Sequence, residues 1–87
     1  MYAVDYSPVA AKQLAKMDRQ TAALVYGWIE KHLVDCENPR AFGKALVGDM
    51  KGFWRYRVGD YRLLARIHDD ALVILFVNIG HRKEIYK

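Results

Sequence analysis

Four arginines stand at even spacings along two neighbouring segments of the sequence: Arg55 and Arg57 are two residues apart, and Arg62 and Arg66 are four apart. Each segment reads as a β-strand, and the Gly59-Asp60 pair between them reads as a tight turn. Because successive side chains of a strand point to opposite faces, each pair of arginines shares a face. In the simplest hairpin register all four guanidinium groups converge on one patch. Like charges that face each other destabilise a sheet, and guanidinium binds phosphate well, so the pattern predicts an anion-binding site.

The same region also admits a structural interpretation. The acids available for surface salt bridges with the arginines are Asp60, Asp69 and Glu84. This region holds fewer acids than cations, which favours a role in binding. The aromatic residues that alternate with the arginines are Trp54, Tyr56 and Tyr61. Their alternation with the arginines favours a place in the core over stacking on RNA.

Length and composition predict one folded domain that spans residues 1–87. Hydrophobic residues make up 53% of the chain, which excludes a disordered tail. The formal net charge is +4, from 14 Lys and Arg against 10 Asp and Glu. This surplus does not establish nucleic-acid binding by itself, but the arginines concentrate between positions 55 and 82. No His or Cys cluster has the spacing of metal ligands, so we expect no metal site.

Cysteine content and hydropathy predict a cytoplasmic protein without membrane association. Cys36 is the single cysteine, and one thiol forms no internal disulfide. We expect it to be a half-buried packing residue rather than a nucleophile. Asp5 and Ser7-Pro8 interrupt the start, so we expect no signal peptide, and no apolar run is long enough to span a bilayer.

The arginine segments follow a predicted N-terminal strand and two helices. Residues 2–6 alternate as a short strand, and Ser7-Pro8 then reads as a helix N-cap followed by proline at the first helical position. Asp18 is a candidate cap for a second helix from about Arg19 to Leu33. Almost no linker separates the helices, which predicts an antiparallel helix hairpin. Asn38-Pro39 ends this region.

Three strands are predicted after the helices, at residues 52–58, 61–67 and 71–79. A connecting segment precedes them, with Leu46 and Val47 as its expected apolar anchors. The third strand is apolar on both faces, as expected of a central strand. The predicted order is strand, helix, helix and a three-stranded antiparallel meander that completes a small sheet, which is an α+β fold.

Element order and motifs together resemble the RelE branch of the RelE/ParE toxin superfamily, over essentially the whole chain. The motifs that carry the resemblance lie at residues 7–14, Asn38-Pro39, residues 43–48, 52–62 and 80–86. Each motif alone is weak, but all five in order and at suitable spacing are specific. The resemblance implies a RelE-like β-α-α-β-β-β fold.

The resemblance further implies an endoribonuclease that cleaves messenger RNA in the ribosomal A site. The 2′-hydroxyl attacks the adjacent phosphate, so neither a metal nor a cofactor is needed. This chemistry requires a proton acceptor, a proton donor and cations around the phosphorus. By resemblance, Arg62 stabilises the phosphate, Arg82 stabilises it or protonates the leaving group, and Tyr86 orients or stacks on the substrate.

One departure from the family concerns the general base. Relatives often carry lysine at the positions of Arg55 and Arg57, and one of these lysines is the proposed base. Arginine stays charged, so Arg57 neutralises a phosphate but is a poor base. Either the ribosome and substrate supply the acceptor, or His81 takes part, since imidazole is suited to proton transfer near neutrality, or the reaction is slow. His81 is otherwise expected to contact RNA or to form part of a turn.

The expected site residues form two sets. The catalytic candidates are Arg55, Arg57, Arg62, His81, Arg82 and Tyr86. The candidates for binding RNA or the ribosome are Lys44, Lys51, Arg66 and Lys83. A second departure is that we expect no C-terminal helix of the kind seen in some relatives, because the sequence stops at Lys87.

Two other functions share this fold and stay open. One is a ParE-like inhibitor that binds DNA gyrase without cleaving RNA, and the other is a non-catalytic binding module. For an active toxin the resemblance implies a small antitoxin, encoded nearby, whose extended or helical segment wraps the helices and sheet. The other expected partners are the ribosome and mRNA, and contact with DNA is expected only through the antitoxin.

Overall fold

A computed structural model describes residues 1–85, and the side chains of residues 1–83. The elements in chain order are β1 (Ala3–Tyr6), α1 (Pro8–Lys16), α2 (Arg19–His32), β2 (Lys44–Ala45), the 3-10 helix η1 (Gly48–Met50), β3 (Trp54–Val58), β4 (Tyr61–His68), β5 (Val73–His81) and α3 (Arg82–Ile85). The predicted α+β order is confirmed, with β2, η1 and α3 as additions.

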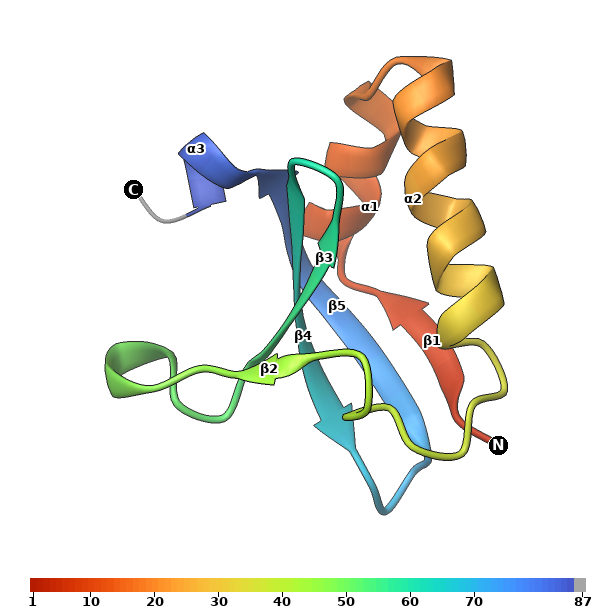
Figure 1. The fold of residues 1–87 in the computed structure, drawn as a ribbon, viewed down its shortest axis with the longest axis vertical. Helices are drawn as coiled ribbons and strands as arrows, with labels where there is room; N and C mark the ends of the chain where they lie inside the picture. Colours follow the sequence, from red (N-terminus) through yellow and green to blue (C-terminus); the bar gives the residue numbers. More distant parts are fainter. Residues whose placement is uncertain (86–87) are drawn as a thin grey trace.

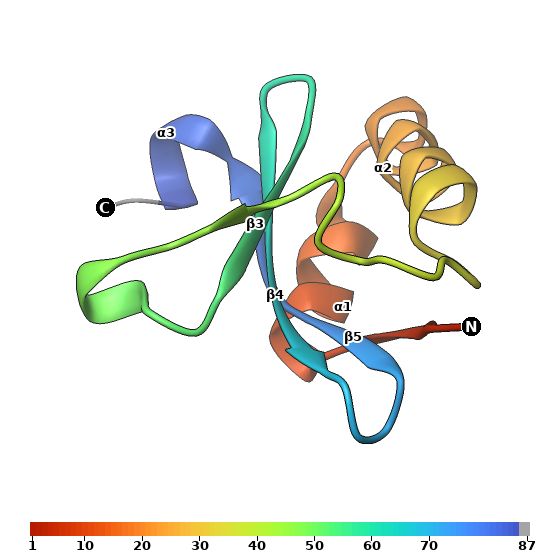
Figure 2. The ribbon, with the colours of Figure 1, turned by 60° about the horizontal axis from the view of Figure 1, so that its bottom comes forward.

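The strands form one sheet in the order β1-β5-β4-β3-β2, in which β1 is parallel to β5 and the other pairs are antiparallel. The predicted meander and the central place of β5 are therefore both confirmed. Helices α1 and α2 run in opposite directions and cover one face of the sheet, while α3 lies on the other face (Figures 1 and 2).

Both long helices begin at the predicted caps. The Ser7 hydroxyl accepts a hydrogen bond from the Ala10 amide at 3.1 Å, and Pro8 occupies the first turn. The Asp18 carboxylate accepts a hydrogen bond from the Thr21 amide at 3.1 Å. Side-chain caps satisfy amides that the first helical turn leaves without partners, which explains why these residues define the helix starts.

The core lies between the sheet and the two long helices. Its largest fully buried side chains include Tyr56, Phe76, Ile29, Leu33, Leu63 and Ile74. The predicted core position of Tyr56 is confirmed, and Trp54 and Tyr61 are half-buried on the same face of the sheet. The expectation for Cys36 also holds, because it is half-buried and packs against the core.

The segment between β2 and β3 projects from the sheet as an arm (green in Figure 1), and here one expectation was wrong. Val47 does not anchor the connection, since 85% of its surface is exposed, whereas Leu46 is half-buried. The Leu46 amide donates to the Phe53 carbonyl at 3.0 Å, so residues 46–53 fold back on themselves. Val47 lies within this arm, outside the core.

After β5 the chain forms α3, a single helical turn that the sequence analysis did not predict. The Arg82 amide donates to the Asp60 carbonyl at 2.8 Å, which ties the start of α3 to the β3–β4 turn. Among residues 1–85, no helix has both the length and the apolar character needed to cross a bilayer.

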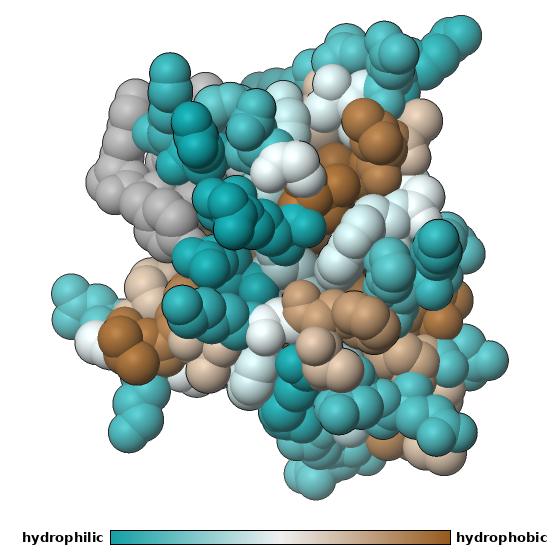
Figure 3. Space-filling model, in the orientation of Figure 1, coloured by the Kyte–Doolittle hydropathy of each residue, from teal (hydrophilic) through white to brown (hydrophobic). Residues whose placement is uncertain are grey.

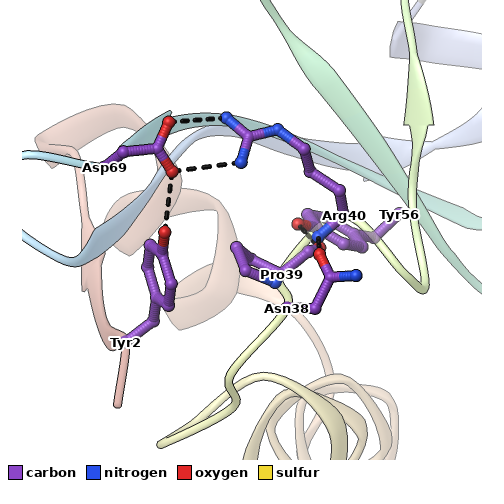
Figure 4. Close-up of polar contacts among 6 residues, drawn as sticks. All are labelled: Tyr2, Asn38, Pro39, Arg40, Tyr56 and Asp69. Atoms are coloured by element: carbon purple, nitrogen blue, oxygen red, sulfur yellow. Dashed lines mark hydrogen bonds and ion pairs between the residues drawn. The ribbon is translucent and has the colours of Figure 1, made fainter.

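The loop between α2 and β2 is anchored to distant parts of the chain (Figure 4). Arg40 binds Asp69 in the β4–β5 turn through two hydrogen bonds of 2.8 and 3.0 Å. The Tyr2 hydroxyl donates to the same carboxylate at 2.7 Å. The buried Tyr56 hydroxyl donates to the Pro39 carbonyl, which connects this loop to the central part of the sheet.

Candidate nucleic-acid interface

The strand register gathers the predicted arginines on the face of the sheet opposite α1 and α2. Arg57 pairs directly with Arg62, and Arg55 pairs with Leu64. The Gly59-Asp60 turn sets this register, and Gly59 has a φ of 57°, which glycine adopts without strain. Residues directly opposite each other share a face of the sheet, so the register agrees with the face predicted for the arginines.

Two further cations extend the same face. Lys44 in β2 is the partner of Arg55 across the β2–β3 ladder. The Arg66 guanidinium lies 4.5 Å from the centre of the Phe53 ring, just beyond the last β3–β4 pair. We use the name cationic face for Lys44, Arg55, Arg57, Arg62 and Arg66.

Burial differs strongly among these side chains. Arg57 and Arg66 are exposed, Arg55 is half-buried, and only 8% of the Arg62 surface is exposed. Arg62 lies in a central strand between Arg57 on β3 and Gly80 on β5. Charges interact more strongly where water is partly excluded, so an anion near Arg57 would also feel a strong field from Arg62.

Arg82 and Lys83 lie at the start of α3, on the same side of the sheet as the cationic face (Figures 1 and 2). Both side chains are exposed. In the space-filling view, hydrophilic side chains gather beside the projecting arm (Figure 3). Lys51 is exposed in this arm, between η1 and β3. Tyr86 lies outside the described residues.

His81 is the predicted site residue that the structure directs to the other face. It pairs with Tyr61, with ring centres 5.7 Å apart, on the side that α1 and α2 cover. Its Nδ1 accepts a hydrogen bond from the Lys83 amide at 3.2 Å. The imidazole lines an open hollow of about 470 Å³ together with Lys16 of α1.

A β-bulge explains why His81 departs from the expected side. Leu64 pairs with Asn78 whereas Ala65 pairs with Phe76, so Val77 is an extra residue in β5. An extra residue reverses the faces of all following side chains. Strict alternation from the buried Phe76 would instead place His81 on the same face as Arg62.

Asp69, one of the acids named in the structural interpretation, is engaged elsewhere in the fold. Asp69 binds Arg40 rather than an arginine of the cationic face. Hydrogen bonds from Arg40 and then Tyr2 lower the pKa of the Asp69 carboxyl to about 2. Among the described side chains, neither Arg57 nor Arg82 takes part in a recorded ion pair.

Phe53 is a side chain of this region that the sequence analysis did not single out. The alternation that assigned Arg55 and Arg57 to one face assigns Phe53 to it as well. Its contact with Arg66 shows that the cationic face carries an aromatic surface beside its charges.

Within residues 1–83 no group of three or more His, Cys, Asp or Glu side chains is placed to hold a metal ion. What the cationic face offers is charge and flat surface, which are suited to a phosphate and a base.

The sequence of residues 4–86 matches the family described as the ParE toxin of the type II toxin–antitoxin system parDE. The chain is 30% identical over 86 residues to Toxin RelG of Mycobacterium tuberculosis, and the match covers 99% of this chain and 97% of that protein. It is 29% identical over 86 residues to Toxin RelE of the same organism, covering 99% of this chain and 87% of the relative.

Solved structures show the same fold. A chain of the toxin–antitoxin complex RelBE2 from Mycobacterium tuberculosis superposes with a TM-score of 0.84 at 29% identity, covering 95% of this chain and 93% of that chain. The isolated RelE toxin of E. coli superposes with a TM-score of 0.76 at 23% identity, covering 99% and 92%. The second likeness concerns the fold alone. Together these matches confirm the resemblance found in the sequence, and the chain belongs to the RelE/ParE superfamily as a RelE-type toxin of a type II toxin–antitoxin system.

Proposed function

We propose that this toxin is a ribosome-dependent endoribonuclease that cleaves mRNA in the A site and thereby inhibits translation in the cytoplasm. The observation that carries the proposal is the direct pairing of Arg57 with Arg62 on the face of the sheet opposite α1 and α2. The exposed Arg57 can contact a phosphate directly, and the buried Arg62 beside it adds a strong positive field. Charge-assisted hydrogen bonds of this kind stabilise the negative charge that grows on phosphate oxygens during transfer.

The proposed reaction is attack of the 2′-hydroxyl oxygen on the adjacent phosphorus. The new oxygen–phosphorus bond forms as the bond from phosphorus to the 5′-oxygen of the next nucleotide breaks. The products are a 2′,3′-cyclic phosphate and a free 5′-hydroxyl. The 2′-hydroxyl proton goes to an acceptor, and the 5′-oxygen receives a proton from a donor. The residues of this chain proposed for the reaction are Arg55, Arg57, Arg62, Arg82 and Tyr86.

The proton acceptor is the part of this mechanism that the cationic face supplies least well. Its arginines remain protonated and therefore do not accept a proton. The His81 imidazole lies on the helix-covered face, where its Nδ1 accepts from the Lys83 amide. This placement favours an acceptor supplied by the ribosome or the RNA over His81.

We further propose that a small antitoxin neutralises the toxin by covering part of its surface. The positive charge of the cationic face gives an acidic segment an electrostatic target, which raises the rate of association. Lys44, Lys51, Arg66 and Lys83 would contact RNA or the ribosome when the antitoxin is absent. Ribosomal RNA attracts such exposed cations through its phosphates.

A ParE-like inhibitor of DNA gyrase is the second candidate function. The observation in its favour is that the matching family takes its description from the ParE toxin. The gyrase inhibitor needs a binding surface but no arrangement of cations around a phosphate, and a non-catalytic binding module likewise needs none. The pairing of Arg57 with Arg62 therefore favours the nuclease.

The test is cleavage of a defined message on programmed ribosomes, with the 5′ ends of the products mapped. We expect cuts in the A-site codon, and we expect Arg57→Ala and Arg62→Ala to slow cleavage roughly 10²–10³-fold, as for loss of a group that stabilises a transition state. Arg19→Ala removes an exposed cation from α2 and should cleave like the wild type. Circular dichroism establishes that the buried Arg62 variant still folds. An intact message together with gyrase inhibition would replace this proposal by the alternative.

A further inference from the structure

Phe53 and Arg66 form a flat, positively charged surface at one end of the cationic face. The Arg66 guanidinium lies over the Phe53 ring, 4.5 Å from its centre. Phe53 is half-buried, whereas Arg66 is exposed. Because the Arg66 side chain is exposed, a ligand can reach the guanidinium from the side away from the ring. An aromatic ring and a guanidinium this close together offer a planar ligand two groups on which it can stack.

The backbone holds this surface in place. The Phe53 amide donates to the Met50 carbonyl at 3.1 Å, and the Phe53 carbonyl accepts from the Leu46 amide at 3.0 Å. Both hydrogen-bonding groups of the Phe53 backbone are therefore engaged in the base of the arm. These hydrogen bonds fix the backbone from which the half-buried ring projects, which reduces the ordering that a stacked ligand requires.

A second cation–π pair, between Arg40 and Trp54, has a structural role in this protein. The Arg40 guanidinium lies 5.5 Å from the centre of the Trp54 ring, and Asp69 neutralises it through two hydrogen bonds. Arg66 differs, because among the described residues it forms no ion pair. Its charge is therefore not used to hold the fold in the way that the charge of Arg40 is.

We infer that Phe53 and Arg66 form a stacking platform for one unpaired nucleobase of the RNA substrate. The inference rests on the proposed nuclease function and deepens it by assigning a base-binding subsite. Unpaired bases stack on aromatic rings and on arginine guanidinium planes, and the charge of Arg66 adds attraction to the RNA backbone. A phosphate would not use the Phe53 ring, and an apolar peptide would not use the charge.

The distance along β4 fits a base close to the reacting phosphate. Arg62 and Arg66 are four residues apart on one face of the strand, which corresponds to about 13 Å. An RNA segment of a few nucleotides that places a phosphate between Arg57 and Arg62 therefore reaches the platform with a neighbouring base. The platform fixes the register of the message on the toxin without taking part in bond breaking.

The test combines changes in the protein with removal of single bases from the message. Programmed ribosomes carry messages in which each nucleotide in or beside the A-site codon is abasic in turn, and kcat and KM are measured for each. Phe53→Leu keeps an apolar side chain without the ring, and Arg66→Lys keeps the charge without the plane. Arg19→Lys on α2 is the matched control. Melting temperatures establish that each variant is folded.

We expect one abasic position to raise KM about tenfold in the wild type while kcat stays nearly constant, as for loss of one stacked base. Phe53→Leu should raise KM by a similar factor on the intact message. On the message that lacks that base, Phe53→Leu should cause no further rise in KM. Arg66→Lys should also raise KM on the intact message but not on the abasic message, and the rise in KM should be smaller. The change in the protein and the removal of the base would then each abolish the same contact.

The platform is overturned if no abasic position changes KM, or if the effects of Phe53→Leu and of each abasic position multiply independently. It is also overturned if Phe53→Leu weakens antitoxin binding and leaves the dependence on bases unchanged, because the surface would then be a protein contact. A wild-type protein that leaves the message intact refutes the nuclease proposal instead. In that case the platform is tested by the Kd for single-stranded deoxyoligonucleotides with and without the base. Equal Kd values would refute the platform.

Discussion

In the proposed reaction, Arg57 would bind the phosphate without acting as a general base. Its guanidinium keeps its proton under ordinary conditions, so it attracts and orients a phosphate but does not remove a proton from the 2′-hydroxyl. Its exposed side chain faces Arg62 across the β3–β4 ladder. A lysine in the same place would stand beside that permanent positive charge, which favours the neutral amine.

Arg57→Lys should therefore give the toxin a general base that it otherwise lacks. We expect single-turnover cleavage on programmed ribosomes to accelerate about tenfold, within the lower range that general-base catalysis contributes. The rate of the variant should also rise with pH as the lysine loses its proton, whereas the wild-type rate should depend less on pH. Arg19→Lys on α2 is the control. A rate as low as that of Arg57→Ala would show that the guanidinium geometry matters more than the missing base.

At the scale of elements, the cationic face depends on how the arm and β2 are held against the sheet. The loop that precedes β2 is attached through Arg40 to Asp69 in the β4–β5 turn and through Pro39 to Tyr56 (Figure 4). The Tyr2 hydroxyl brings the N-terminal end of β1 to the same carboxylate. These contacts tie three separate parts of the chain together, and β2 brings Lys44 beside Arg55.

This attachment should weaken in acid, with a sign that follows from the pKa of Asp69. The hydrogen bonds from Arg40 and Tyr2 lower that pKa to about 2, below the unfolded value of about 3.9. A lowered folded pKa means that the carboxylate stabilises the protein above the unfolded pKa and loses this contribution as pH falls toward 2. Because half of the Asp69 side chain is exposed, we expect a modest effect.

The measurement is the difference in Tm between wild type and Asp69→Asn as a function of pH. The variant should melt lower at pH 7, and the gap should close between about pH 5 and pH 2. Asp70→Asn changes the neighbouring exposed carboxyl and is the control. A gap that stays constant to pH 2 would mean that the charge of Asp69 contributes nothing through Arg40.

At the scale of the whole molecule, the protein separates its apolar and cationic contacts between the two faces of one sheet. Helices α1 and α2 bury one face, and the cationic face with the start of α3 occupies the other (Figure 1). The net charge of +4 is therefore less informative than its distribution. If the placement of the charges rather than their total controls activity, a cation moved to the helix side of the sheet should no longer contribute to cleavage.

The double variant Arg57→Gln with Gln20→Arg keeps the net charge and transfers one cation to the exposed surface of α2. We expect it to cleave as slowly as Arg57→Gln alone, while Gln20→Arg alone should match the wild type. The comparison uses the same programmed ribosomes at two salt concentrations, since salt screens long-range attraction. Recovery of cleavage in the double variant would show that the total charge is what matters.

The sequence by itself determined the features that depend on local pattern. Alternation along residues 54–66 set the faces of the hairpin, the Ser7 and Asp18 side chains set the helix starts, and the apolar run near Phe76 marked a central strand. Such features require only the periodicity of a strand or the unsatisfied amides of a helix. The order and spacing of the five motifs predicted the family.

Only the tertiary structure decided the features that depend on pairing between distant segments. The bulge at Val77 turns His81 away from the arginines, and the pairing of β2 with β3 adds Lys44 to them. The projecting arm leaves Val47 exposed and supports Phe53 under Arg66. A one-residue change in strand register reverses the face of every following side chain, and no local pattern in this sequence revealed that change.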